Sequence, residues 1–151
     1  MAFKPHEIAY LNSADLGRLA TIQPNGTLQN SPVGFRYNEQ LGTFDVYGYN
    51  LAKSQKFRNV AANNTVALVV DDIFSHDPWR VRCLEIRGTA EQAENAGGEP
   101  LIRIIPKRII SFGIDDTDTE AHALVPDSRD VRRRPVRSVA APRGRPPRRL
   151  R

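Results

Sequence analysis

Turn signals at intervals of about eight to twelve residues divide most of this chain into short runs of strand length. Pro, Asn and Gly, which suit tight turns, mark breaks at 24–26, 38–42 and 97–98. The runs follow one another without regular helical crossovers, which argues against a doubly wound parallel sheet. We therefore predict a β-rich α+β fold, a closed or half-closed antiparallel barrel of about six strands.

The apolar pattern predicts strands at 18–22, 28–37, 43–49, 65–70 and 80–92, and a final pair at 102–105 and 108–114 around Pro106. Because proline cannot donate to a ladder, Pro32 predicts an edge position or a bulge in its strand. The alternation slips near Cys83 and Leu84, which predicts a bulge there. Residues 71–79 are polar and are predicted to form a loop.

Two segments have the character of helices. Pro5 suits the first turn of a short helix that ends before Gly17, since its missing N–H has no helical partner there. Between 53 and 63 the period changes, and Phe57 and Val60 fall on one face of a second helix. We expect both helices to flank the sheet.

The charge of the chain is divided unevenly. The net charge is +5 over 151 residues, but residues 127–151 hold ten Arg and two Asp, a net +8, so residues 1–126 carry a net −3. A basic domain fold of the kind that binds nucleic acid is therefore excluded. The Arg- and Pro-rich end has no hydrophobic periodicity and is predicted to be disordered. It either contacts nucleic acid through phosphates or has no role.

Several function classes are excluded by residues that the chain lacks. Cys83 is the only cysteine, so neither an intramolecular disulfide nor a cysteine zinc site is possible, and a reducing compartment is expected. His6, His76 and His122 lack the spacing of metal ligands, and we predict no metal site. The longest apolar run, 66–70, is too short for a membrane span. The N-terminus does not resemble a secretion signal, so we expect a cytoplasmic protein.

The start of the second predicted helix has the residues of an anion site. With Ser54 as N-cap, Lys56 lies at the second helical position, beside backbone N–H groups that have no helical partner. These donors, the helix dipole and neighbouring cations suit a phosphate. The alternative is an ordinary capped helix with a solvated basic face, and the spacing alone leaves both open.

A second candidate contact is Trp79, the only tryptophan, in a polar stretch before Arg80. It either stacks on a planar ligand or partner chain, or covers the rim of the sheet. No nucleophile and base pair can be nominated, and no catalytic residue is proposed from the sequence. If the protein is an enzyme, a cofactor carries the chemistry.

Three ordered segments resemble a known family. LATI at 19–22, QNSPVGF at 29–35 and KSQKFRNV at 53–60 resemble the pyridoxamine 5′-phosphate oxidase-like superfamily. DPW at 77–79 with EIRG at 85–88, and RIISFGI at 108–114, are similar to its small branch that uses the deazaflavin coenzyme F420. The resemblance covers about residues 6–115.

The resemblance implies a six-stranded split β-barrel with flanking helices, working as a homodimer with cofactor sites between the subunits. It implies an oxidoreductase that transfers hydride from F420, or from FMN as the alternative, to a small planar or unsaturated substrate. The residues implied in cofactor binding are Asn30, Ser31, Pro32 and Val33 along the ring, Tyr49, Asn50, Ser54, Lys56, Arg58 and Asn59 toward the phosphate, and Trp79 and Arg80 from the partner chain.

Gln55 departs from this family pattern, because a basic residue often stands at its place; Lys53 could compensate for that charge. We expect one domain at 1–115 and a disordered tail at 116–151. Two other functions stay open, a non-catalytic flavin or F420 binder on the same fold and a nucleic-acid binder that acts through the tail.

Overall fold

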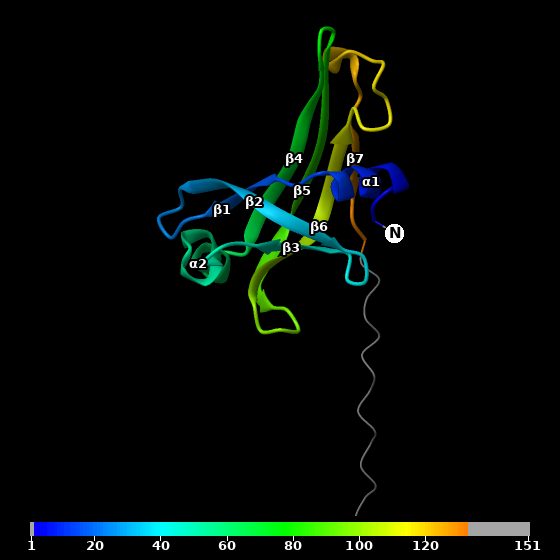
Figure 1. The fold of residues 1–151 in the computed structure, drawn as a ribbon. Helices are drawn as coiled ribbons and strands as arrows, with labels where there is room; N and C mark the ends of the chain where they lie inside the picture. The colour runs from blue at the N-terminus through cyan, green and yellow to red at the C-terminus, as the bar shows by residue number, and fades with distance from the viewer. Residues whose placement is uncertain (1, 133–151) are drawn as a thin grey trace, which may run out of the picture.

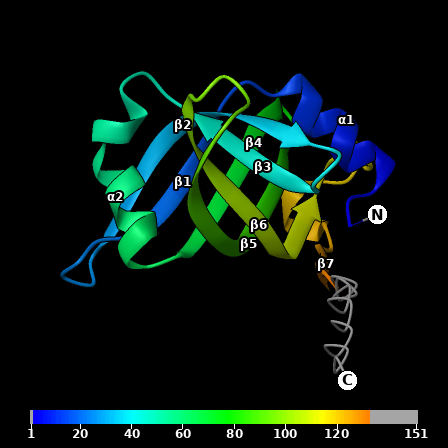
Figure 2. The same cartoon turned by 90° about the horizontal axis from the view of Figure 1, so that it is seen from below.

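One antiparallel sheet of seven strands makes up most of the molecule, with a helix at each end of it (Figures 1 and 2). The structure is a computed structural model that describes residues 2–132. Its strands are β1 (Gly17–Ile22), β2 (Leu28–Asn38), β3 (Thr43–Tyr47), β4 (Thr65–His76), β5 (Trp79–Glu94), β6 (Pro100–Phe112) and β7 (Asp127–Asp130). The helices are α1 (Pro5–Ser13) and α2 (Gln55–Ala62), with short 3-10 turns η1 (Leu51–Lys53) and η2 (Ala121–Ala123).

The sheet closes on itself. Its strand order is β3-β2-β1-β4-β5-β6-β7, and β3 also pairs with β6 through partners such as Val46 and Ile102. Strands β1 to β6 therefore form a continuous ring of pairings, which is seen from below in Figure 2. Strand β7 pairs with β6 outside that ring. The interior holds fully buried side chains such as Phe44, Leu68 and Ile86. The predicted β-rich antiparallel fold is confirmed.

Strand β2 changes partner halfway along its length. Residues 28–33 pair with β1 alone, and residues 34–38 pair with β3. Gln23 donates its backbone N–H to the carbonyl of Thr27 at 2.8 Å. In an antiparallel pair every second residue bonds to the partner strand, so counting on from Thr27 the bonded residues include Ser31 and Val33. Pro32 lies between them and directs its backbone nitrogen away from β1. That side of β2 has no partner strand at Pro32, so the missing N–H costs no ladder bond. The predicted edge position of Pro32 is confirmed.

The predicted loop at 71–79 was wrong. Strand β4 continues to His76 and β5 begins at Trp79, so the two strands form a hairpin that projects beyond the rest of the sheet (Figure 1). Polar residues can extend these strands because they pair across them: Arg82 donates to Asp72 from Nε at 2.9 Å. Tyr10 of α1 also donates to Asp72, at 2.8 Å. Within residues 2–132, no helix is long and apolar enough to cross a membrane.

The bulge predicted at Cys83 and Leu84 lies elsewhere. The register shifts between Ile73 and Ser75 in the hairpin, and between Arg87 and Gly88 where β5 meets β6. At Gly88 a Cβ atom would lie 2.0 Å from the carbonyl oxygen of Ile105, so only glycine fits this crossing. Pro106 lies opposite Gly88, inside one continuous strand β6 rather than between two segments.

The boundary predicted at residue 115 was also wrong. Strand β7 pairs with the second half of β6, and Val131 donates its N–H to the carbonyl of Lys107 at 2.7 Å. Arg129 forms an ion pair with Glu7, a fully buried residue of α1. Residues 116–132 therefore belong to the folded unit, because the pairing of β7 with β6 and the ion pair between Arg129 and Glu7 attach the C-terminal part of this segment to the sheet and to α1. The rest of the predicted tail, 133–151, lies outside the described residues.

Candidate cofactor site

Ser54 caps helix α2 as the sequence predicts. Its backbone is extended, and its Oγ accepts the N–H of Phe57 at 3.3 Å while donating to the carbonyl of Leu51 at 2.6 Å. Among the bonds of the described chain, the N–H groups of Gln55 and Lys56 find no acceptor, as expected for the first turn of a helix. Two donors at a positive helix end therefore remain available to an anion.

Three cations surround this helix end: Lys53 in η1, and Lys56 and Arg58 in the first turn and a half of α2. The Arg58 guanidinium folds back over the N-terminus, where Nη1 donates to the carbonyl of Lys53 at 2.9 Å and Nη2 to Gln55 Oε1 at 2.8 Å. Gln55 thus holds Arg58 in place instead of adding a charge. We call Lys53, Ser54, Lys56 and Arg58 the cationic corner.

Asn59 was expected to contact the cofactor, but it lies beneath the cationic corner. Its side chain is fully buried, and its amide donates to Thr21 Oγ1 and to Gln29 Oε1, each at 3.0 Å. Its oxygen accepts from Gln55 at 2.7 Å. Asn59 therefore holds α2 against β1 and β2 and so positions the cationic corner. Both the nitrogen and the oxygen of its side-chain amide already have hydrogen-bond partners within the chain.

The four residues expected along the cofactor ring divide between the two faces of β2. Asn30 and Pro32 are exposed on the outer face, whereas Ser31 is half-buried on the inner face and Val33 belongs to the core. Alternation along a strand produces this division. Gly34 continues the outer face, and a Cβ there would meet no atom within 4 Å. Between residues 30 and 34 the outer face of β2 is consequently open and bears no large side chain.

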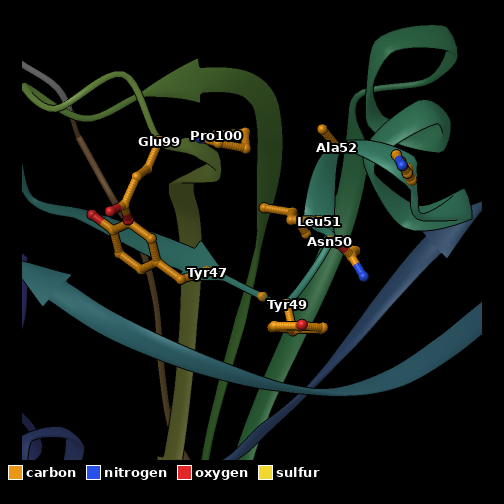
Figure 3. A pocket seen from close by; sticks show the side chains of 9 residues that line it. Tyr47, Tyr49, Asn50, Leu51, Ala52, Glu99 and Pro100 are labelled. Atoms are coloured by element: carbon orange, nitrogen blue, oxygen red, sulfur yellow. The ribbon is translucent and has the colours of Figure 1, made fainter.

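Tyr49 and Asn50 line a cavity between the end of β3, η1 and the β5–β6 connection (Figure 3). Its volume is about 390 Å³. Asn50 adopts a left-handed conformation with φ of 56°, a region that asparagine tolerates better than most residues, and the turn leads directly into η1. The side chain of Tyr49 is almost completely exposed. Lys53 lines the same cavity, so the cavity adjoins the cationic corner.

Trp79 and Arg80 are not near the other predicted site residues in one chain. Both lie at the tip of the β4–β5 hairpin, where Trp79 pairs with His76. Strand β4 begins shortly after α2 and its twelve residues lead to that tip, so its eleven steps of ~3.3 Å span about 36 Å. Figure 1 shows the tip far from α2. Trp79 is half exposed, and Arg80 Nη1 is buried with no hydrogen-bond partner in the described chain.

Sequence reasoning missed residues that line the cavities around β3. Tyr47, Glu99 and Pro100 share the cavity with Tyr49, and Arg36 joins Tyr47 and Glu99 in an adjoining one. The β5–β6 connection brings Glu99 to β3 across about a third of the chain. No motif or spacing in the sequence indicates this proximity, because it depends on the closure of the sheet.

The fold and the site together define a class: a small protein built on a closed antiparallel sheet, with an open strand edge beside a cationic helix end. The family model described as pyridoxamine 5′-phosphate oxidase matches residues 4–134. The chain belongs to the pyridoxamine 5′-phosphate oxidase family, and the resemblance seen in the sequence is confirmed.

Relatives of known structure or sequence agree with this assignment. A 5a,11a-dehydrotetracycline/5a,11a-dehydrooxytetracycline reductase of Streptomyces rimosus subsp. rimosus is 43% identical over 131 residues, covering 82% of this chain and 92% of the relative. A solved F420 reductase is 24% identical with a TM-score of 0.54, covering 67% of this chain and 93% of its own. A conserved hypothetical protein of Mycobacterium tuberculosis is 21% identical with a TM-score of 0.61, covering 72% and 84%. The two solved structures support the fold.

Proposed function

We propose that this chain is an F420-dependent oxidoreductase that reduces an unsaturated, planar substrate. The observation that carries the proposal is the cationic corner, with free helix N–H groups, next to an open strand edge in a member of this family. The 43% identity to a dehydrotetracycline reductase supports reduction as the reaction.

The residues of the corner suit the phosphate of such a cofactor. The N–H groups of Gln55 and Lys56 point out of the helix end without acceptors in the described chain, and Lys56 and Arg58 add positive charge beside them. A phosphate there gains hydrogen bonds and a favourable dipole. Ser54, Lys56 and Arg58 would hold this group, while Lys53 would extend the positive surface toward the acidic tail that distinguishes F420 from FMN.

The outer face of β2 suits a flat ring. Asn30, Pro32 and Gly34 present small groups, so a planar ring can approach the backbone closely. When bound, the reduced cofactor supplies a hydride; the net reaction adds that hydride and a solvent proton across a carbon–carbon double bond. The chain's own residues would anchor the phosphate and orient the ring. The binding energy of the phosphate, which lies away from the reacting carbon, would thereby help to hold the ring in the orientation that the reaction needs.

We further propose that the active form is a homodimer of split barrels. One chain leaves Trp79 and Arg80 far from the cationic corner, so they reach a cofactor only if it belongs to a second chain. The hairpin also exposes Ile73, Phe74 and Trp79, and a partner would cover this apolar surface. An acceptor on the partner would also satisfy the buried Arg80 Nη1, which is costly to leave without a hydrogen bond.

Turnover with reduced cofactors tests the proposal. Purified protein is mixed with reduced F420 and a 5a,11a-dehydrotetracycline, and oxidation of the cofactor is followed optically. We expect turnover with reduced F420, much slower turnover with reduced FMN, and loss of most activity in Lys56→Ala. Preference for FMN would move the protein to flavin chemistry. Tight F420 binding without turnover of any planar unsaturated compound would favour the non-catalytic binder.

A further inference from the structure

We propose that a groove centred on Tyr47 is the substrate-recognition end of the site, and that Arg36 there binds the ionised enol of a planar polycyclic substrate. We call the residues Arg36, Tyr47, Asn95 and Glu99 the Tyr47 groove. The inference rests on the proposed function, since it assigns the substrate class to the same site. It goes further by naming the ionic group that the chain recognises.

Arg36 is a cation whose natural partner is already bonded elsewhere. In the register of the sheet, Asp45 lies opposite Arg36 on one side and opposite Arg103 on the other. The Asp45 carboxylate is buried and takes two bonds from Arg103, at 3.0 and 3.2 Å. Within residues 2–132 Arg36 forms no ion pair, and its guanidinium lies 5.9 Å from the centre of the Tyr47 ring. An exposed, pre-positioned cation therefore remains free for a ligand.

Three cavities meet at Tyr47. One of about 260 Å³ is lined by Arg36, Tyr47, Asn95 and Glu99, and one of about 440 Å³ is lined by Arg36 and Tyr47 together with residues such as Asn38 and Glu39. The third is the cavity of about 390 Å³ that also contains Tyr49 and Lys53. The two larger cavities have volumes in the range of small-molecule sites, and the cavity of about 260 Å³ is slightly smaller. The three cavities share Tyr47, and the third also has Lys53 of the cationic corner in its lining.

The Tyr47 groove contains a positively charged donor, Arg36, and a negatively charged acceptor, Glu99. Arg36 can donate two bonds from its planar guanidinium to an ionised 1,3-dicarbonyl, whose two oxygens share the negative charge and can face the same way. Glu99 contributes an acceptor to the same cavity, and Figure 3 shows its side chain directed toward the ring of Tyr47. Among the described side chains Glu99 has no ion pair, and only a long contact of 3.5 Å with Asn95. A ligand with an acidic enol and a nearby hydroxyl or amide N–H satisfies both groups.

The cationic corner is assigned to the cofactor phosphate and not to the substrate. Lys53 of the corner lines the cavity next to the Tyr47 groove, together with Tyr49 and Asn50. Arg36 is therefore expected to affect substrate affinity and not F420 affinity. This separation makes the recognition of substrate measurable apart from the recognition of cofactor.

The probe is tetracycline, which carries an acidic enolic carbonyl system on a planar polycycle. It is titrated calorimetrically into the full-length protein, with and without saturating F420, in buffer with a chelator to prevent metal complexes. We expect binding that weakens at least tenfold in Arg36→Gln, and several-fold in Glu99→Gln. Arg87→Gln is the matched control, because Arg87 is an exposed strand arginine outside these cavities. It should bind tetracycline like the wild type.

F420 titrations of the same variants separate the two proposals and check folding. Unchanged F420 affinity in Arg36→Gln, together with the tenfold loss for tetracycline, supports the groove. Equal tetracycline affinity in Arg36→Gln and wild type, or no tetracycline binding by the wild type, overturns it. If the wild type binds tetracycline through Arg36 but does not bind F420, the groove stands and the proposed cofactor falls.

Discussion

The side-chain amide of Asn59 donates to Thr21 Oγ1 at 3.0 Å, a fully buried bond that joins helix α2 to strand β1. The same amide donates to Gln29 of β2, so one residue ties the helix to both strands of the first hairpin. The N-terminus of α2, with its free N–H groups, is held in position by this bond. The geometry of the cationic corner therefore depends on a residue that lies under it.

Replacing Asn59 by alanine should destabilise the fold. The change leaves the hydroxyl of Thr21 and the amides of Gln29 and Gln55 without their buried partner, and we expect the free energy of unfolding to fall by about 2–4 kcal/mol. Urea denaturation measures the loss. The control is Asn64→Ala, at an exposed position, which should change stability by less than about 0.5 kcal/mol. Equal stabilities of the two variants would contradict the positioning role.

Acid should weaken the link between α1 and β7. Burial raises the pKa of Glu7, but hydrogen bonds from Arg129, Ser111 and the Lys4 backbone outweigh it, so the pKa lies below 4.5. A carboxyl with a lowered pKa in the folded state stabilises the fold above its unfolded pKa, and loses this contribution as the pH falls through the folded value. We expect wild type to exceed Glu7→Gln in stability at pH 7, and the difference to shrink below about pH 4.5.

Denaturation at a series of pH values measures this difference. Glu39→Gln, an exposed control, should follow the wild type at every pH. A gap between wild type and Glu7→Gln that stays constant from neutral to strongly acidic pH would show that the Glu7 carboxylate does not contribute through its charge.

Truncation at two positions tests whether β7 belongs to the stable unit. Deleting 133–151 removes none of the described contacts and should leave the melting temperature nearly unchanged. Ending the chain at Pro126 also removes Arg129 and leaves the Glu7 carboxylate buried without its cation, which should cost about 3–5 kcal/mol. Thermal unfolding of the two truncated proteins compares them. Similar melting temperatures would show that β7 adds nothing to the stability of the fold.

Gly88 should not tolerate a side chain. A Cβ there would lie 2.0 Å from the Ile105 carbonyl oxygen and 3.3 Å from the Lys107 nitrogen, both in backbone that cannot move without breaking the β5–β6 pairing. Gly88→Ala should therefore lower the free energy of unfolding by more than about 3 kcal/mol. Gly34→Ala, where a Cβ meets open space, is the control and should fold normally. A stable Gly88→Ala protein would be incompatible with the crossing described for β5 and β6.

Local signals predicted the parts of the fold that depend on neighbours in sequence. The turns at 24–26 and 38–42 separate strands that pair in the structure, and Pro32 lies on an open edge as its missing N–H requires. The errors occurred where a distant partner decides the structure. The segment 71–76, predicted to be part of a polar loop, forms a strand in which Arg82 pairs with Asp72. Strand β7 is held by Arg129, which reaches Glu7, 122 residues away.

The site divides in the same way. The cap at Ser54 and the cations beside it could be predicted because capping and dipole effects act within one turn. The burial of Asn59 could not, since it requires Thr21 and Gln29 to be placed below α2. Arg36 and Glu99 meet at Tyr47 only because the sheet closes, and their spacing in sequence gives no sign of it.

The most direct test of the account is the affinity of the cationic corner for a phosphorylated cofactor. F420 and FMN are each titrated, by ligand fluorescence, against the full-length wild type and two variants, Lys56→Ala and Lys107→Ala. Lys107 is the control, because it is an exposed lysine of β6 away from the corner. We expect micromolar F420 binding, weaker FMN binding, at least a tenfold loss of F420 affinity in Lys56→Ala, and no loss in Lys107→Ala. F420 affinity that is the same in wild type and Lys56→Ala, or no binding of either cofactor, would contradict the account.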